Sequence, residues 1–389
     1  MTAAAQARPA GRWRAWLRAW PSEDWLGWFD RRLAVYIVAL GIANALLCIG
    51  FPVVFKFGWD FDIYWRAAQD VAAGHGAYAA TLAIGADQWG PGGLTYVYPP
   101  FLAYVLAPFS ALPAAAGFLG WSIAGTALLY ASIRAMPPDA AVRRYPRLFL
   151  GLGVVWITLF LGQVNLVVLA GLLLALGSRD DRLAGGGLAL AALLRVTPAA
   201  FAVLFILDGR WRALGWAVGL GALGALVGLA DWPAYVGILR TLTGLPPVVT
   251  IWQTSLASIA LPLAVLAAAI VVAVVILAGR RPSEARLVRG TAIGLGLLLV
   301  PATSWYHWTA FAIAPLLVDG GRPAWGRRAL LGFLLAGWLL VPLGSWATTL
   351  VASAVLATLA WKVVAPPAVR PGGAGAVAAR SGVTPGGVA

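Results

Sequence analysis

Two carboxylates, Asp60 and Asp62, lie in the polar stretch that follows the first long apolar run of the chain. A carboxylate held close to a membrane has less water around it, which disfavours its charged form and suits it to act as a general base. The other interpretation is that one of the two caps a short amphipathic helix that begins near Ile63. Asp60 lies nearer the apolar run and Asp62 lies nearer that helix. We therefore expect Asp60 to be the base and Asp62 the cap, with Asp62 kept as a second catalytic candidate.

An arginine, Arg195, stands in an otherwise apolar stretch that Pro198 interrupts three residues later. Placing an arginine at membrane depth costs at least ~2.5–3.5 kcal/mol on insertion scales, so a partner is expected. A guanidinium can hold a phosphate by forked hydrogen bonds, or it can pair with a loop carboxylate. The sequence therefore predicts either a site for a lipid phosphate or a structural ion pair at this position.

Three further polar clusters, at 162–165, 252–255 and 304–308, lie beside or between short apolar runs. Their amide, hydroxyl and aromatic side chains suit a sugar ring, which has many hydroxyl groups and apolar CH faces. For the aromatic residues the alternative is a belt at the membrane interface. For His307 the alternative to a binding role is that of an interfacial histidine whose hydrogen bonds are satisfied. In these clusters the residues expected to bind substrate are Gln163, Asn165, Trp252, Gln253, Ser255 and Trp305.

The composition indicates that membrane-spanning helices position these residues. Hydrophobic residues make up 61% of the 389 and charged residues only 11%, whereas soluble domains carry roughly 25% charged residues. This excludes a soluble protein and a disordered one. Cys48 is the single cysteine and there are two histidines, so neither a disulfide scaffold nor a metal cluster is expected. We expect no metal and no cofactor.

Twelve apolar runs follow one another between residues 33 and 361, and several are shorter than the ~20 residues that a full span needs. Short runs that meet at a polar break are typical of helices that end around a buried or water-filled cavity. The predicted fold is an all-α polytopic membrane protein with about 10–13 transmembrane helices, several of them short or broken. The proline-bounded stretch 96–108 is predicted to be a re-entrant or surface helix.

The distribution of basic residues predicts the orientation. With the N-terminus in the cytoplasm, 24 of the 28 basic residues are cytoplasmic, as the positive-inside rule requires. The four outer ones are Lys56, Arg66, Arg195 and Arg240. The net charge of +14 thus reflects membrane topology and not nucleic-acid binding. Because 26 of the basic residues are arginine, which is typical of a GC-rich bacterial genome, we expect a bacterial inner (plasma) membrane protein with both termini cytoplasmic.

This orientation divides the chain into three regions. Residues 1–32 form a basic, tryptophan-rich segment that is expected to lie on the membrane as an interfacial helix and to contain no cleavable signal peptide. Residues 33–363 form the transmembrane domain, in which 56–97 is the first extracytoplasmic loop. Residues 364–389, rich in Gly, Pro and Ala, are expected to be a disordered cytoplasmic tail.

These segments, in this order, resemble the GT-C superfamily of membrane glycosyltransferases, and in particular family 87, the polyprenyl-phosphate-mannose-dependent alpha-mannosyltransferase-like proteins. The resemblance covers about residues 33–345. The matching elements are the Asp60–Tyr64 motif, Gly74–Tyr78, Tyr98-Pro-Pro, 162–165, the stretch 193–198, 252–255 and 304–307. One departure is Arg195, where the family often has lysine.

The resemblance implies a GT-C-like bundle that transfers a sugar from a polyprenyl-phosphate donor to an acceptor hydroxyl at the extracytoplasmic face. It implies that mannose is the sugar and that the anomeric configuration is inverted. It implies that Asp60 is the base, that Arg195 and His307 bind the donor phosphate, and that Tyr64 and Tyr98 bind substrate. The implied partners are the lipid-linked donor, a glycolipid or polysaccharide acceptor and membrane lipids, with no nucleic acid.

Two other functions remain compatible with the sequence. One is a transporter or flippase of lipid-linked sugars, for which inverted repeats are expected but none is found. The other is a non-catalytic membrane subunit of polysaccharide assembly. A transfer assay with radiolabelled polyprenyl-phosphate sugars distinguishes the three.

Overall fold

The computed structural model describes residues 27–28, 30–32, 58–84, 95–150, 152–244, 254–301, 308–338 and 341–365. The regular elements in these ranges are helices, and no strand occurs among them. The interfacial helix predicted around residues 13–20, the first apolar run 33–55 and the tail from 366 onwards lie outside the described residues.

The helices follow one another with short connections. The first half of the described chain contains α3 (Trp59–Ala72), α4 (Ala79–Ala83), α5 (Pro100–Leu106), η2 (Ala107–Phe109), α6 (Ala114–Ala135), α7 (Ala141–Arg144), α8 (Pro146–Leu150), α9 (Gly153–Leu161), α10 (Asn165–Gly177) and α11 (Asp181–Leu194). The second half contains η3 (Thr197–Phe201), α12 (Ala202–Leu207), α13 (Trp211–Leu226), η4 (Leu229–Asp231), α14 (Trp232–Gly244), α15 (Leu261–Leu277), η5 (Ala278–Arg280), α16 (Ala285–Leu299), α17 (Thr309–Asp319), α18 (Ala324–Trp338) and α19 (Val341–Val364).

Full-length membrane spans are accompanied by shorter apolar helices. In the described part of the chain, three stretches are long and apolar enough to cross a membrane unaided: Ala114–Ala135, Leu261–Arg280 and Ser345–Val364. A fourth candidate combines Trp211–Leu226 with Leu229–Leu242, which meet at an angle of 85°. Helices of 10–17 residues, such as Asn165–Gly177 and Thr309–Asp319, match the short runs seen in the sequence. The predicted all-α polytopic membrane architecture is confirmed.

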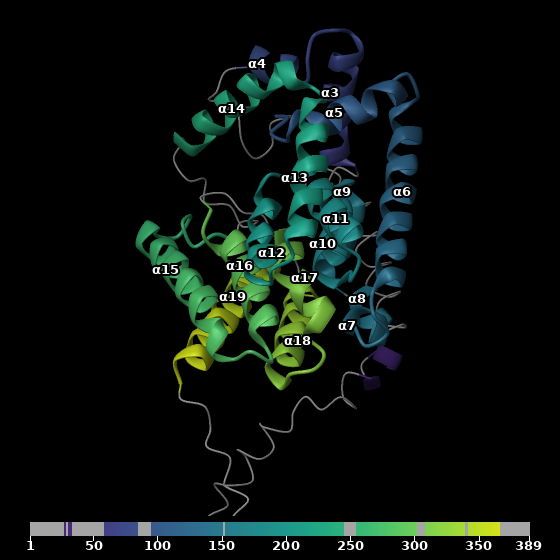
Figure 1. Cartoon of the computed structure of the whole chain (residues 1–389). Coiled ribbons are helices and arrows are strands. Elements are labelled where there is room, and N and C mark those ends of the chain that lie inside the picture. Colours follow the sequence, from purple (N-terminus) through teal and green to yellow (C-terminus); the bar gives the residue numbers. More distant parts are fainter. Residues whose placement is uncertain are drawn as a thin grey trace, which may run out of the picture.

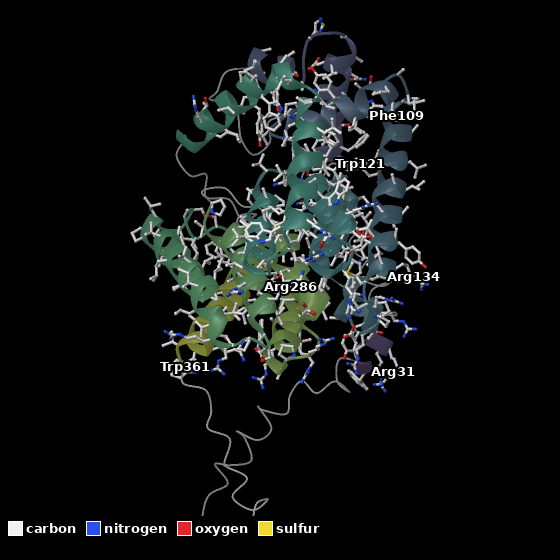
Figure 2. All side chains as sticks on the ribbon, viewed as in Figure 1. Arg31, Phe109, Trp121, Arg134, Arg286 and Trp361 are labelled. Carbon is white, nitrogen blue, oxygen red and sulfur yellow. The ribbon has the colours of Figure 1, made fainter. Side chains whose placement is uncertain are left out.

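The bundle has two different ends (Figure 1). At one end α3, α4, α5 and α14 gather; we call this the α3 end. At the other end lie α7, α8 and α18; we call this the basic end, because Arg31 and Arg134 lie toward it (Figure 2). Helix α6 runs from the neighbourhood of Phe109 at the α3 end toward Arg134. The re-entrant or surface helix expected at 96–108 corresponds to α5 and η2, which pack against α3.

Small residues allow the central helices to pack closely. A Cβ on Gly171 of α10 would lie 2.5 Å from the carbonyl oxygen of Gly187 on α11, and the converse distance is also 2.5 Å. Such close backbone contact is typical of helix pairs in membranes, where van der Waals packing replaces the hydrophobic driving force. Nearly every residue of α10 and α17 is buried, so these two helices form the centre of the bundle.

Helix α3 begins earlier than predicted. Its N-cap is Gly58, whose φ of 73° is left-handed, and its first residue is Trp59 and not Ile63. The Gly58 amide donates to the carbonyl oxygen of Phe160 at 3.0 Å, which ties the start of α3 to the end of α9. Asp60 and Asp62 therefore both lie in the first turn of the helix, and no side chain caps it. The prediction that Asp62 caps this helix is wrong, because the helix begins at Trp59, where the Gly58–Phe160 contact fixes its start.

Candidate active site

The break between α9 and α10 brings the polar residues of 162–165 against α3. Gly162 ends α9 with a φ of 69°, and a Cβ at this position would lie 2.7 Å from the Cβ of Phe61. Only glycine combines this left-handed conformation with so close an approach at no steric cost. The indole nitrogen of Trp121, on α6, donates to the carbonyl oxygen of Gly162 at 3.0 Å. Gln163 is consequently held beside the first turn of α3.

Gln163 joins three side chains from two segments, Asp60 and Tyr64 on α3 and Tyr98 just before α5. Its Oε1 accepts hydrogen bonds from the hydroxyls of Tyr64, at 3.3 Å, and Tyr98, at 3.4 Å. Its side chain also hydrogen-bonds Asp60. Because both hydroxyls donate to the amide oxygen, the amide nitrogen is left to donate to the carboxylate. Gln163 is itself buried, so this network fixes the position of the Asp60 carboxylate.

The environment of Asp60 weakens its acidity. The residue is half-buried, and removal of water from around the carboxyl raises its pKa from 3.8 to about 6. The Gln163 hydrogen bond and the positive charge of Arg195 act in the opposite direction and limit the rise. Asp60 is thus ionised at neutral pH while remaining basic enough to accept a proton near pH 6.

Arg195 lies at the end of α11, where the sequence predicted a break. Its Nη2 donates to the hydroxyl of Tyr98 at 3.1 Å. Its guanidinium carbon lies 5.0 Å from the ring centre of Tyr98 and 4.9 Å from that of Trp308. Pro198 falls in η3, which packs back against α11. The turn thus holds Arg195 between two aromatic rings, which attract a cation.

The remaining residues predicted to bind substrate or phosphate are buried, already hydrogen-bonded, or outside the described part of the chain. Tyr64 has no exposed surface, so it supports Gln163 and does not present itself to a sugar. Asn165 is buried at the first residue of α10. Ser255 is buried too; its hydroxyl donates to the carbonyl oxygen of Pro301 and accepts from the amide of Ala257 at 3.0 Å. The Ser255 hydroxyl, which was expected to bind substrate, therefore makes its hydrogen bonds within the protein. Trp252, Gln253, Trp305 and His307 lie outside the described residues.

Asp62 points in a different direction from Asp60. Residues two apart on a helix lie about 200° apart around its axis, so the two carboxylates cannot face the same group. Asp60 is the one that contacts Gln163 and is near Arg195. The geometry favours Asp60 over Asp62 as the acid of this cluster.

Two site residues were missed from the sequence. Trp308 faces Arg195, and Trp121 holds Gly162. Trp308 belongs to the polar cluster at 304–308, but its type also fits a membrane-interface belt, so its role was not evident. Trp121 lies inside an apolar run and gave no signal. Among the residues that the structure describes, no three His, Cys, Asp or Glu side chains are grouped as a metal site requires.

The sequence profile of glycosyltransferase family 87 matches residues 96–301, which is more than half of the chain. The chain belongs to glycosyltransferase family 87. The resemblance inferred from its ordered motifs is thereby confirmed. Tyr98, Gln163 and Arg195 lie inside the matched region, whereas Asp60 precedes it.

A curated relative of this family 87 protein comes from Mycolicibacterium smegmatis. It is a polyprenol-phosphate-mannose-dependent alpha-(1-2)-phosphatidylinositol pentamannoside mannosyltransferase, 33% identical over 137 residues. The aligned part is 33% of this chain and 33% of the relative, so the match spans a third of the relative's length. No solved structure gives a significant match.

Proposed function

We propose that this family 87 protein transfers mannose from a polyprenyl-phosphate donor to a hydroxyl of a glycolipid or polysaccharide acceptor, with inversion at the anomeric carbon. The observation that carries the proposal is the constellation at the α3 end. There, the Asp60 carboxylate, with a pKa of about 6, is linked through Gln163 and Tyr98 to the guanidinium of Arg195. The name of the Mycolicibacterium smegmatis relative, which specifies polyprenol-phosphate-mannose, supports the choice of donor.

The proposed reaction is a direct displacement. Asp60 removes the proton from the acceptor hydroxyl as its oxygen attacks the anomeric carbon of the donor sugar. The bond from that carbon to the phosphate oxygen breaks on the opposite face, which inverts the configuration. Arg195 neutralises the negative charge that develops on the polyprenyl phosphate, and its Tyr98 hydrogen bond orients it for this task. His307 completes the phosphate site in this proposal, and Asp62 takes no part in proton transfer.

We also propose that the α3 end is extracytoplasmic and the basic end cytoplasmic, in a bacterial plasma membrane. The arginines near the basic end agree with the positive-inside rule. The acid and the guanidinium of the site then lie on the side where the basic residues are few.

The test is a transfer assay on the full-length protein in lipid nanodiscs. Radiolabelled polyprenyl-phosphate mannose is supplied with a membrane glycolipid extract, and parallel reactions contain the glucose or arabinose donor. We expect labelled product from the mannose donor, with an anomeric configuration opposite to that of the donor by NMR. Retained configuration would overturn the displacement mechanism. Absence of transfer from all three donors would favour a non-catalytic subunit.

A further inference from the structure

A polar cavity lies at the far end of α10, the helix that begins beside Gln163. It has a volume of about 370 Å³ and is lined by the C-terminal end of α10, the turn before α13, the start of α16 and the end of α17, among others. Gln163 and Arg195 flank the start of α10 and the end of α11, whereas this cavity adjoins the end of α10. It is therefore distinct from the Asp60 site.

Arginines dominate the charge of the cavity wall. Four arginines line it, Arg179, Arg210, Arg286 and Arg322, against two carboxylates, Asp139 and Asp319. The wall itself thus carries two more positive than negative charges, but Arg322 is paired with Asp139, and Arg210 and Arg286 are paired with acids outside the wall. Arg179 is the arginine of the wall for which the described residues show no ion pair. Guanidinium groups that share one partly enclosed space repel one another, because the local dielectric is lower than that of water. An anion placed among them would offset this repulsion.

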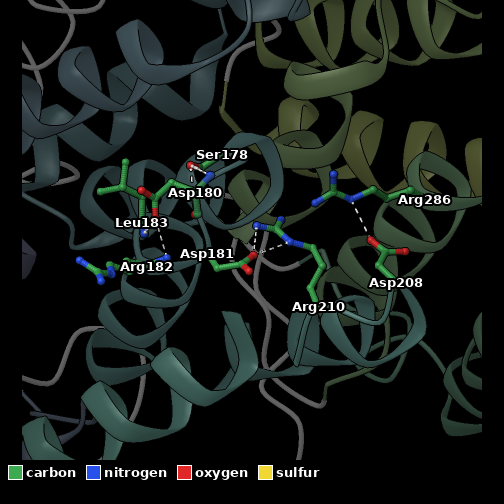
Figure 3. A network of polar contacts seen from close by, with 8 residues as sticks. All are labelled: Ser178, Asp180, Asp181, Arg182, Leu183, Asp208, Arg210 and Arg286. Atoms are coloured by element: carbon green, nitrogen blue, oxygen red, sulfur yellow. Dashed lines mark hydrogen bonds and ion pairs between the residues drawn. The ribbon is translucent and has the colours of Figure 1, made fainter. Parts of the chain in front are cut away.

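Two carboxylates outside the wall orient the arginines. Asp181 accepts hydrogen bonds from Nε and Nη2 of Arg210, at 3.0 and 2.7 Å. Asp208 pairs with Nε of Arg286 at 3.1 Å. Figure 3 shows the Arg286 side chain extending toward Arg210, whose guanidinium is turned to Asp181. These pairs engage Nε and Nη2 of Arg210 and Nε of Arg286, so each guanidinium keeps further N–H groups with which to bind a ligand.

Two of the arginines retain unused donors. Nη2 of Arg286 is buried and makes no hydrogen bond within the described part of the chain. A buried donor of this kind normally has a partner, because an unsatisfied buried donor loses its hydrogen bond to water without replacement. Arg179 is exposed and has no ion-pair partner among the residues that the structure covers. Both observations point to a ligand that accepts hydrogen bonds and is negatively charged.

We propose that this cavity binds a phosphate group through Arg179, Arg210 and Arg286. Guanidinium forks match the geometry of phosphate oxygens and remain charged at every physiological pH. The phosphate belongs either to the headgroup of an anionic phospholipid or to a soluble phosphate compound, since both offer the same oxygens. The proposal stands independently of the proposed transferase activity, because it uses none of the residues around Asp60.

The first arm of the test measures thermal unfolding of the full-length protein in neutral detergent with increasing pyrophosphate, against sodium chloride of equal ionic strength. Binding to the folded state should raise the apparent Tm by roughly 2–4 °C at about ten times Kd. The second arm uses native mass spectrometry to count cardiolipin or phosphatidylglycerol molecules retained from nanodiscs.

Three variants make the outcome specific. Arg179→Gln changes an exposed arginine that has no ion pair to lose. The double variant Arg179→Gln with Arg286→Gln removes two guanidinium groups that would donate hydrogen bonds to the phosphate. Arg212→Gln is the control. Arg212 is exposed on α13, two residues after Arg210, and does not line the cavity. We expect the Tm shift or the retained lipid to be at least halved in the single variant, lost in the double variant and unchanged in the control.

A pyrophosphate response identifies a soluble ligand, and lipid retention without such a response identifies a headgroup. If the double variant does not fold, the comparison of Arg179→Gln with Arg212→Gln decides. No response in either arm, or equal responses in the Arg179 and Arg212 variants, would overturn the proposal and leave a purely structural ion-pair cluster.

Discussion

The side-chain amide of Gln163 is hydrogen-bonded to the carboxylate of Asp60, although Gln163 lies in the break between α9 and α10 and Asp60 lies in the first turn of α3. The amide cannot rotate freely, because Tyr64 and Tyr98 both donate to its oxygen. This contact stabilises the charged form of Asp60 and offsets part of the effect of burial. Under the proposed function, Gln163 positions the base, a role in addition to the substrate binding predicted from the sequence.

Replacement of Asp60 by Asn should abolish transfer while donor binding stays nearly unchanged. The amide keeps the shape of the side chain but cannot accept a proton, and loss of a general base lowers rates by about 10²- to 10⁴-fold. Asp62→Asn is the matched control on the same helical turn and should keep most of the activity. The measurement is kcat in the nanodisc assay together with donor binding. If Asp62→Asn is inactive and Asp60→Asn is active, Asp62 is the base and Asp60 is not.

The pH profile should report the raised pKa of Asp60. Its ionised form is the base, so kcat/KM should rise with pH, reach half of its plateau near pH 6 and stay constant above it. At one unit below the midpoint the rate should be about a tenth of the plateau. An acidic limb with a midpoint near pH 4 would instead indicate a solvated carboxylate. Initial rates from pH 4.5 to 8.5 provide this profile.

Replacement of Gln163 by Ala should move the midpoint of that profile upward. The hydrogen bond from Gln163 lowers the pKa of Asp60, so its removal raises that pKa further. Activity at pH 8 should be affected less than activity at pH 6. A role confined to sugar binding predicts the opposite pattern, an increased KM with an unchanged midpoint. Gln69→Ala, at an exposed position of α3, is the control.

Arg195→Lys should retain partial activity, and Arg195→Gln should lose about 10²- to 10³-fold in kcat, as when a donor to a developing oxyanion is removed. Lysine keeps the charge but has no planar group to stack between Tyr98 and Trp308. Arg66→Gln, an exposed arginine on α3, serves as control. Normal turnover and donor affinity in Arg195→Gln would remove the phosphate role.

Labelling from one side of the membrane should confirm the orientation. In a Cys48→Ala background, a cysteine at Ala73, which is exposed after α3, should react with a membrane-impermeant thiol reagent in intact spheroplasts. A cysteine at Pro138, exposed between α6 and α7, should react only after permeabilisation. The reverse pattern would place the site in the cytoplasm.

Features that depend on local chemistry were predictable from the sequence. Proline and glycine restrict the backbone around themselves, so the breaks at Pro198 and Gly162 and the short helices beside them could be expected. Charge and apolar content identified the membrane class, and motif order identified the family. The guanidinium of Arg195 could be named because a charged group in an apolar stretch requires a partner. The candidate acids could be named because they directly follow the first long apolar run.

Features that depend on distant contacts were not predictable. The start of α3 is set by a hydrogen bond to Phe160, which no property of residues 58–63 reveals. The hydroxyl of Ser255 donates a hydrogen bond to the carbonyl oxygen of Pro301, a contact that the sequence around residue 255 does not reveal. The roles of Trp121 and Trp308 likewise arise from residues 40 or more positions away in the chain.

The order of the site residues along the chain bears on biosynthesis. Asp60, Tyr98, Gln163, Arg195 and Trp308 come from five separate stretches. A ribosome produces α3 before Tyr98, Gln163, Arg195 and Trp308 exist. At that point neither the Gln163 hydrogen bond nor the Arg195 charge acts on the Asp60 carboxylate, and the guanidinium of Arg195 is not yet present for a phosphate. Under the proposed function, a nascent chain arrested before residue 195 cannot use lipid-linked donor, so unfinished protein does not compete with the finished enzyme for it.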